Sequence, residues 1–362
     1  MKLFLIALSL YSIINACYAA APCASLPPGL EKLRHGIDLV TFDMFPEDVT
    51  AEPGLAGTIF DFTCDEKKKW ANPAIPANQY DLPDQIESIT HLPGGIMDSR
   101  AIVMSSYNDR QKSHSNNAPN NYMDNPGKWQ EFLSLFGTHY FSTARFGGVF
   151  HLEVDTAKGY TESHTEKDLS LQAGISYQSF ISINGSHTVG KNATDKAFRD
   201  ASNEKAYYYG GNADLVNAGP NGFQQWWNSA QANPWLFGGV LEPMINFIPN
   251  GPKKNAIQTA IDVKLDYAAL DQMLTELGIL KQNPYIDMAT ANSFVAQVNA
   301  ERAKPIPPHA RVLQLSAAIE PFIKVQKSKK APVVKPVCQV VYDKKLKKNV
   351  CVNPTTCTCN VH

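Results

Sequence analysis

The clearest pattern of hydrophobic positions lies where a short helix runs into a long strand. Four apolar residues have the i, i+3, i+4, i+7 spacing of one helical face: Trp129, Phe132, Leu133 and Phe136. Asn125-Pro126 supplies a cap and a first-turn proline, and Gly137 ends the helix. The following segment, Thr138–Phe150, is rich in β-branched and aromatic residues, and Gly147-Gly148 within it marks a bend. The pattern predicts a helix that leads through a glycine into a bent, twisted strand.

A second pattern, of period two, runs from Leu169 to Val189. Its apolar positions are Leu169, Leu171, Ala173, Ile175, Tyr177, Ile181, Ile183 and Val189. Apart from Phe180, the residues between them are small or uncharged, as a lipid-facing and lumen-facing strand of a membrane barrel requires. The run exceeds the roughly nine to eleven residues of one crossing, so it fits a hairpin turning near Ser179-Phe180 or one tall strand. An ordinary antiparallel strand with one wet face has the same period.

The remaining elements are shorter or less distinct. Strands are expected at Gly36–Phe42, Gly57–Cys64, Ala101–Met104 and Tyr207–Tyr209. Helices are expected at Asn255–Leu280 and Met288–Ala303, while Val312–Val325 fits either state. Near the end, Val337–Tyr342 and Val350–Val352 predict a hairpin that turns within Asp343–Lys348.

Composition and the first residues indicate the compartment. Hydrophobic residues make up 44% of the 362 positions, and a formal charge of −1 gives no sign of a nucleic-acid partner. Met1-Lys2, the apolar run Leu3–Ile14 and the small residues around Ala19 predict a signal peptide over residues 1–20. A membrane anchor is the alternative, but the apolar run is too short to span a bilayer. We therefore expect a secreted, extracellular protein.

Removal of the signal peptide takes Cys17 with it and leaves six cysteines, an even number that predicts disulfides in an exported chain. Their segregation suggests one bridge between Cys23 and Cys64. It also suggests two bridges in the tail, where three connectivities are possible among Cys338, Cys351, Cys357 and Cys359. Zinc binding by the tail with His362 is the alternative, but the spacing fits no common site. We expect no metal and no cofactor.

The tail is also rich in lysine. Lys344, Lys345, Lys347 and Lys348 lie near the turn of the expected hairpin. Such a cationic module suits an anionic lipid or a sulfated sugar, at roughly 1 kcal/mol per lysine near a charged surface. A solvated tail without a partner fits the same residues.

The motif Phe136-Gly137-Thr138-His139-Tyr140 resembles the signature of the membrane-attack-complex/perforin (MACPF) family of pore formers. Two further features occur in the family's order. Gly210-Gly211 resembles a glycine pair that lets the bent sheet open, although a plain turn is the alternative reading. The closing run of the family resembles Phe223–Ser229, Asn233-Pro234 and Leu241–Ile248 of this chain. The resemblance implies a tryptophan helix, an Asn-Pro turn and an apolar strand that contains Pro243.

The resemblance implies an α+β fold: a bent and twisted antiparallel sheet flanked by helix clusters, to which this chain adds a small disulfide-rich C-terminal module. We expect a MACPF-like domain at residues 21–285, a helical or linker segment at 286–335 and a basic cysteine-rich module at 336–362. The implied activity is pore formation. Monomers bind a target-cell membrane, form a ring or arc edge to edge, and insert amphipathic hairpins. The second helix cluster, compact before insertion, falls at Leu169–Val189.

Two features depart from the family pattern. The interval between Ser99 and the lead-in helix is short and polar for a first helix cluster, and Asn116–Asn121 suits an exposed loop. Sequons also occur at Asn184 and Asn192, and a glycan on Asn184 would have to cross the bilayer during insertion. The alternative function is therefore a non-lytic extracellular binding, developmental or egg-associated factor with the same fold.

Enzymatic activity is not expected. His139 follows Thr138, and Glu153 and Asp155 lie nearby, but no nucleophile elbow, phosphate loop, zinc-ligand pair or paired-carboxylate motif accompanies them. The resemblance places His139 in a packed helix-to-strand junction. Its imidazole is expected to make that junction sensitive to pH.

Overall fold

The computed structural model describes most of the chain in two compact units, Met1–Leu265 and Asp266–His362. The described residues are 21–47, 53–73, 77–92, 96–101, 115–161, 163–165, 167–173, 196–219, 221–327, 329, 339–343 and 348–352. Among the helices of these residues, none combines the length and the apolarity that crossing a bilayer requires.

The first unit contains a six-stranded antiparallel sheet with β7 at its centre. Its strands are β1 (His35–Ile37), β2 (Leu55–Thr58), β5 (Ile86–Leu92), β6 (Ile96–Ala101), β7 (His139–Gly147) and β10 (Trp235–Pro243). The order is β2-β1-β7-β6-β5, and β10 pairs along the whole of β7. A separate hairpin joins β3 (Lys69–Ala71) to β4 (Gln79–Asp81). Of the predicted strand Ala101–Met104, Ala101 is the last residue of β6, and residues 102–104 lie outside the described residues.

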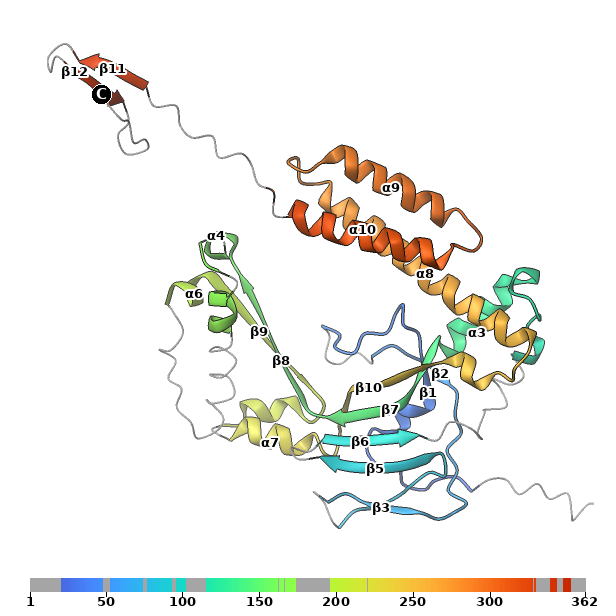
Figure 1. Cartoon of the computed structure of the whole chain (residues 1–362). Coiled ribbons are helices and arrows are strands. Elements are labelled where there is room, and N and C mark those ends of the chain that lie inside the picture. The colour runs from blue at the N-terminus through green and yellow to red at the C-terminus, as the bar shows by residue number, and fades with distance from the viewer. Residues whose placement is uncertain are drawn as a thin grey trace, which may run out of the picture. The chain divides into compact units, whose positions relative to one another are not determined.

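The expected bend is present at Gly147-Gly148. There β7 ends, and β8 (Val149–Thr156) continues as a two-stranded ribbon with β9 (Ser202–Tyr209). Figure 1 shows this ribbon leaving the sheet at an angle, with α4 (Lys158–Thr161) and α6 (Lys196–Ala201) at its far end. The aromatic strand expected at Tyr207–Tyr209 is the end of β9.

The start of the alternating segment is helical over residues 167–173, as the resemblance implies for the second helix cluster before insertion, and is not the ordinary strand that the periodicity also fits. The physical cause is a capping box. Thr165 Oγ1 accepts a hydrogen bond from Asp168 N at 3.2 Å, and Asp168 Oδ2 accepts one from Thr165 N at 3.2 Å. The threonine side chain also donates to Asp168, and these hydrogen bonds lower the pKa of that carboxyl. Leu169 and Ala173 line, with Val154 and Thr156 of β8, a pocket of about 330 Å³.

The longer helices of the first unit are α3 (Pro126–Phe136) and α7 (Gly222–Ser229). The 3-10 helices are η1 (Leu30–Arg34), η2 (Tyr122–Asp124), η3 (Ala213–Asn217) and η4 (Met244–Phe247). As predicted, the Asn125 side chain caps α3 by accepting from Lys128 N, and Gly137 ends the helix. The four residues of its predicted apolar face, Trp129, Phe132, Leu133 and Phe136, are buried in the core.

Two predicted strands end earlier than expected, and both end where β7 begins. β10 stops at Pro243, which lies opposite His139, and η4 replaces the rest of the expected strand to Ile248. β1 stops at Ile37, which also lies opposite His139. The residues after Ile37 and after Pro243 have no residue of β7 opposite them. They therefore cannot extend the two strands by pairing with β7, whatever the hydrophobic pattern of their sequence.

The second unit is built on three helices. The first, α8 (Pro252–Leu280), begins in the first unit and ends in the second, where it joins α9 (Met288–Arg302) and α10 (His309–Lys327). Their shared core is Leu270, Met273, Leu277, Leu280, Ile286, Ala291, Val298, Val312, Leu315, Ile319 and Ile323. Val312–Val325 is therefore helical. The units divide at Leu265, whereas we predicted a domain limit at residue 285, because the second half of α8 packs on α9 and α10.

The tail contains the expected antiparallel pair, β11 (Gln339–Asp343) and β12 (Lys348–Val352). Three of its cysteines, Cys338, Cys357 and Cys359, lie outside the described residues, as do Lys344, Lys345 and Lys347. A disulfide-rich and lipid-binding module therefore stays a prediction.

A disulfide joins Cys23 to Cys64, which is the pairing that the segregation of the cysteines predicts, with their Cα atoms 5.1 Å apart. Backbone contacts surround it. Pro22 forms a β-bridge with Thr63, and Cys64 N donates to Ala21 O at 2.9 Å. The bridge fixes the first described residues on the sheet domain.

Replacing both cysteines, as Cys23→Ala with Cys64→Ala, is expected to lower the free energy of unfolding of the first unit. The bridge closes a loop with a sequence separation of 41, for which the chain-entropy model gives about 4 kcal/mol. Urea titration followed by tryptophan fluorescence measures the change. An unfolding free energy within 1 kcal/mol of wild type would contradict the prediction.

Candidate functional site

The signature residues form a junction in which the end of α3 meets β1. Gly137 has φ 82° and ψ 177°, a conformation almost confined to glycine, and a Cβ atom there would lie 2.6 Å from backbone atoms of Ile37. Gly36, on the opposing strand, has no room for a Cβ either, because Phe136 O would be 1.6 Å away. A glycine on each of the two segments therefore allows their backbones to touch.

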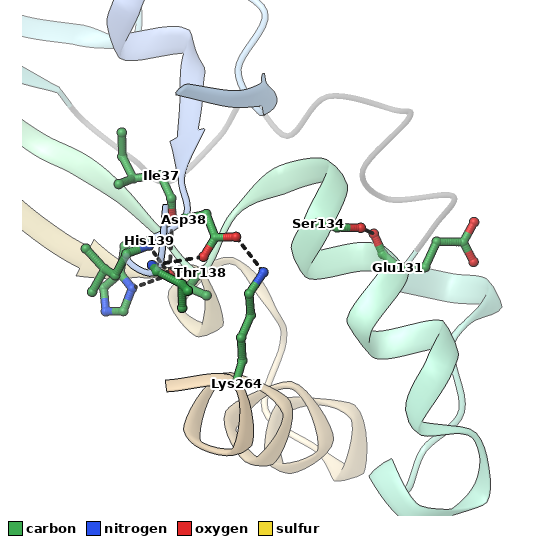
Figure 2. A network of polar contacts seen from close by, with 9 residues as sticks. Ile37, Asp38, Glu131, Ser134, Thr138, His139 and Lys264 are labelled. Carbon is green, nitrogen blue, oxygen red and sulfur yellow. Dashed lines mark hydrogen bonds and ion pairs between the residues drawn. The ribbon is translucent and has the colours of Figure 1, made fainter. Parts of the chain in front are cut away.

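Thr138, with no exposed surface, is the centre of the hydrogen bonds at this junction. Its amide donates to Ile37 O at 2.7 Å, and its hydroxyl donates to the same oxygen at 3.2 Å. The hydroxyl oxygen accepts from Leu39 N at 3.2 Å, and Thr138 O accepts from Met244 N at 2.9 Å. One threonine thus joins β1, the start of β7 and η4. Figure 2 shows Thr138 beside Ile37 and His139.

His139 and Tyr140 continue the junction into β7. The His139 Nδ1 atom lies 3.0 Å from Thr138 Oγ1, and burial lowers the pKa of its imidazole, against a smaller opposing effect of Glu242. Tyr140 is 2% exposed and packs between Phe60 and Phe247, with ring centroids at 5.9 and 4.3 Å. Burial raises the pKa of this phenol. The histidine thus belongs to a packed junction, as expected from the resemblance.

An ion pair that the sequence did not indicate completes the junction. Lys264, on α8, reaches Asp38, the first residue after β1 (Figure 2). Their side chains are only 18% and 13% exposed, so the pair is shielded from solvent screening. It holds the end of β1 against α8. The two residues are 226 positions apart in the sequence, and no local motif links them.

The four predicted hinge glycines meet at the bend, at the other end of β7. Gly210 and Gly211 have φ values of 76° and 66°. A Cβ on Gly210 would lie 2.9 Å from Gly147 O, and one on Gly148 would lie 2.9 Å from Ala230 Cβ. Close packing therefore favours glycine at position 148, and both close packing and backbone conformation require it at positions 210 and 211.

The helix α7 packs into this bend. Trp226 is completely buried, and its Nε1 atom donates to Gly210 O at 2.8 Å. Ser229 Oγ accepts from Asn212 N at 2.8 Å, and Gly211 N donates to Asn233 O at 2.7 Å. These bonds pair Gly210 O, Gly211 N and Asn212 N, so the bend has a defined closed geometry.

The predicted membrane-inserting face lies only partly within the described residues, and the two sequons lie outside them. Leu169, Leu171 and Ala173 lie on the helical segment 167–173, whereas Ile175, Tyr177, Ile181, Ile183 and Val189 lie outside the described residues, with Asn184 and Asn192. Within the described part of the chain, no group of three or more His, Cys, Asp or Glu side chains is placed to hold a metal ion.

Replacing Gly137 by alanine is expected to lower the free energy of unfolding by at least ~2 kcal/mol, since the backbone conformation and the contact with Ile37 both exclude a Cβ. Gly127→Ala is the matched control at the other end of α3, where the nearest atom is Asn125 Oδ1 at 3.4 Å. It should stabilise slightly through helix propensity. Thermal melting of both variants makes the comparison; equal melting temperatures would contradict it.

Acid is expected to destabilise the first unit through His139. Because burial lowers the pKa of this imidazole in the folded state, the unfolded chain binds the proton more readily. Stability should therefore fall as the pH drops below about 6.5, until the lowered folded pKa is passed. Melting temperatures at pH 7.5 and 5.5 should differ less for His139→Gln than for wild type. They should differ more for Glu242→Gln, which loses the charge that raises this pKa; the opposite order would refute the assignment.

Comparison with known proteins agrees with this geometry. The family model described as the MAC/Perforin domain matches residues 58–274. The Perivitellin-2 67 kDa subunits of Pomacea canaliculata and Pomacea maculata are each 20% identical to this chain, over 334 and 319 residues. These matches cover 74% and 70% of this chain but only 58% and 55% of those subunits, so the chain spans little more than half of their length.

Two solved structures are also similar. One is the crystal structure of GNIP1Aa from Chromobacterium piscinae, with a TM-score of 0.46, 16% identity and coverage of 65% of this chain and 55% of that one. The other is Astrotactin-2, titled a conserved vertebrate-specific and perforin-like membrane protein involved in neuronal development. It has a TM-score of 0.37, 12% identity and coverage of 64% and 45%. Since the family model matches more than half of the 362 residues, the chain belongs to the MAC/Perforin domain family.

Proposed function

We propose that this protein is a secreted, non-enzymatic pore former that assembles edge to edge on a target membrane and inserts one β-hairpin per subunit. The observation that carries the proposal is the register of the β8–β9 ribbon. Its ladder runs without a shift from Val149↔Tyr209 to Thr156↔Ser202.

Continuing that ladder makes a specific inserted hairpin. Each step forward in β8 is one step back in β9, so the same register pairs Leu169 with Val189 and Tyr177 with Ile181. Ser179 is then the tip, and the pair Ser179-Phe180 is where the alternation of the sequence is interrupted. Two independent observations, the register of described strands and the hydrophobic pattern, therefore give the same turn.

The register also determines which side chains share a face. Odd positions pair with odd positions, so the apolar residues of both arms lie on one side of the hairpin. A shift of one residue would put the apolar face of one arm beside the polar face of the other. Burial of this single apolar face in lipid would supply the driving force for insertion.

The length of the hairpin suits a bilayer. Its apolar arms, residues 169–177 and 181–189, match the roughly nine to eleven residues of a tilted transmembrane strand. Charged residues begin directly beyond them, at Asp168 on one arm and Lys191 on the other. These charges would remain at the membrane surface.

Assembly would use the edges of the sheet. β5 pairs only with β6, and β10 pairs only with β7, among the strands of the described residues. The outer edges of β5 and β10 therefore present backbone groups that a neighbouring subunit can pair with.

One observation favours the non-lytic alternative, an extracellular factor with the same fold. β5 and β6 are paired up to Leu92↔Ile96, so only residues 93–95 connect them at the end of the sheet where β7 bends. We expected a first helix cluster after Ser99, but β6 leads from there toward the opposite end of β7, since Arg100 lies opposite Thr143. The bend end thus carries one long excursion, residues 157–201, instead of two.

The variant Leu171→Arg tests the assignment of the apolar face of the hairpin to lipid, and Ser170→Arg is its matched control. Both residues are exposed on the helical segment 167–173, so neither change should disturb the soluble protein. In the hairpin, Leu171 would face lipid, where arginine costs up to roughly 2–4 kcal/mol depending on depth, and Ser170 would face the lumen. Dye release from liposomes should slow at least about tenfold for Leu171→Arg only.

Two results would contradict the pore proposal. One is wild-type protein that neither oligomerises nor releases dye under any lipid composition or pH. The other is equal activity of the two arginine variants, which would remove the hairpin assignment. Mass spectrometry of the secreted protein decides the alternative, because a glycan found on Asn184 would make insertion of this arm too costly.

A further inference from the structure

The segment Asp38–Glu47, which we call the strap, follows β1 and runs from the signature junction to the bend. The sequence suggested a strand as far as Phe42, but the amides of Thr41 and Phe42 both donate to Asp38 O, at 3.0 and 2.8 Å, and turn the chain away from the sheet. The strap then packs on β7, where the Phe42 ring meets Phe141 edge-on with centroids 6.0 Å apart.

At the bend the strap contacts the two strands on either side of the glycine turn. Tyr209 OH donates to Pro46 O at 2.9 Å, and Trp235 Nε1 donates to Met44 O at 2.9 Å. The ring of Phe45 packs on Tyr209 with centroids 5.4 Å apart. Tyr209 is the last residue of β9 and Trp235 is the first of β10. Two carbonyls of one short segment therefore hold the facing ends of two strands.

The two aromatic rings that donate to the strap are buried and are packed against other side chains. Tyr209 and Trp235 are 2% and 7% exposed, and their rings are 5.4 Å apart. The ammonium group of Lys32 lies 4.7 Å from the Trp235 ring centroid, a cation–π contact. Burial, and then the strap carboxylates of Asp43 and Glu47, raise the pKa of Tyr209, so this phenol keeps the proton that it donates.

The other end of the strap is fixed on the signature junction. Asp38 pairs with Lys264, and Leu39 N donates to the buried Thr138 hydroxyl. A strap held at both ends cannot follow a large movement of β9 relative to β10 without losing the contacts at one end. The bend itself, with Gly210-Gly211 between these strands, is the place where such a movement would occur.

We propose that the strap is a clamp that holds β9 and β10 in the bent arrangement, and that its release from Tyr209 and Trp235 must precede opening of the bend. The clamp is a property of the soluble protein. Its role in controlling membrane insertion rests on the proposed function.

Tyr209→Phe tests the clamp, with Tyr207→Phe as the matched control. Both variants lose one phenol hydroxyl from the same face of β9, but Tyr207 OH donates to Glu153 at 2.8 Å, within the ribbon, and not to the strap. Hydrogen exchange of peptides covering residues 38–47 measures local opening of the strap. Loss of one buried hydrogen bond should speed exchange roughly fivefold in Tyr209→Phe and leave it unchanged in Tyr207→Phe.

Exchange in the strap at the wild-type rate in Tyr209→Phe, or equal acceleration in both variants, would overturn the clamp.

Dye release from liposomes is the second measurement. Tyr209→Phe should release dye faster than wild type, and Tyr207→Phe should match wild type. If wild type leaks and Tyr209→Phe, with a loosened strap, leaks no faster, the strap does not control insertion. If no variant leaks, the pore proposal fails, and hydrogen exchange still decides the clamp.

Discussion

The close approach of two backbones at the signature junction is the contact on which the rest of the first unit depends. Gly36 and Gly137 leave no side chain between β1 and the end of α3, and the buried Thr138 fills the gap with hydrogen bonds. This contact fixes where β7 begins, and hence where β1 and β10 must stop. It also directs the chain after Ile37 into the strap, because the ladder has no further position for it.

The opposite end of β7 has a similar construction with a different consequence. Gly210 and Gly211 again bring backbones together, but here they lie between strands that continue at an angle, and Trp226 fills the bend. The junction joins elements at one end of β7, whereas the bend joins two pairs of strands through a turn that only glycine can form. The strap contacts both ends of β7. It therefore connects the signature junction at one end to the glycine bend at the other.

The structure separates the evidence for the fold from the evidence for the activity. The fold rests on the buried residues of the sheet and its helices, and the family model matches the same region, residues 58–274. The proposed activity depends on the excursion between β8 and β9, whose hydrophobic pattern at its start suits a lipid-facing strand better than the helix seen there. Under that proposal the segment would serve two states, so its periodicity need not describe the one in which the capping box of Thr165 and Asp168 holds it helical.

The sequence by itself determined the elements whose signals are local: α3 with its cap and terminal glycine, the bend at Gly147-Gly148, the long helices and the pairing of Cys23 with Cys64. It also identified the family from a motif whose glycine and threonine have a physical role. Only the tertiary structure decided where strands end, which glycines meet, and that Lys264 reaches Asp38. The reason is that strand ends and close approaches are set by the partner's position, as with Ile37 and Pro243 opposite His139, and a single sequence carries no record of that partner.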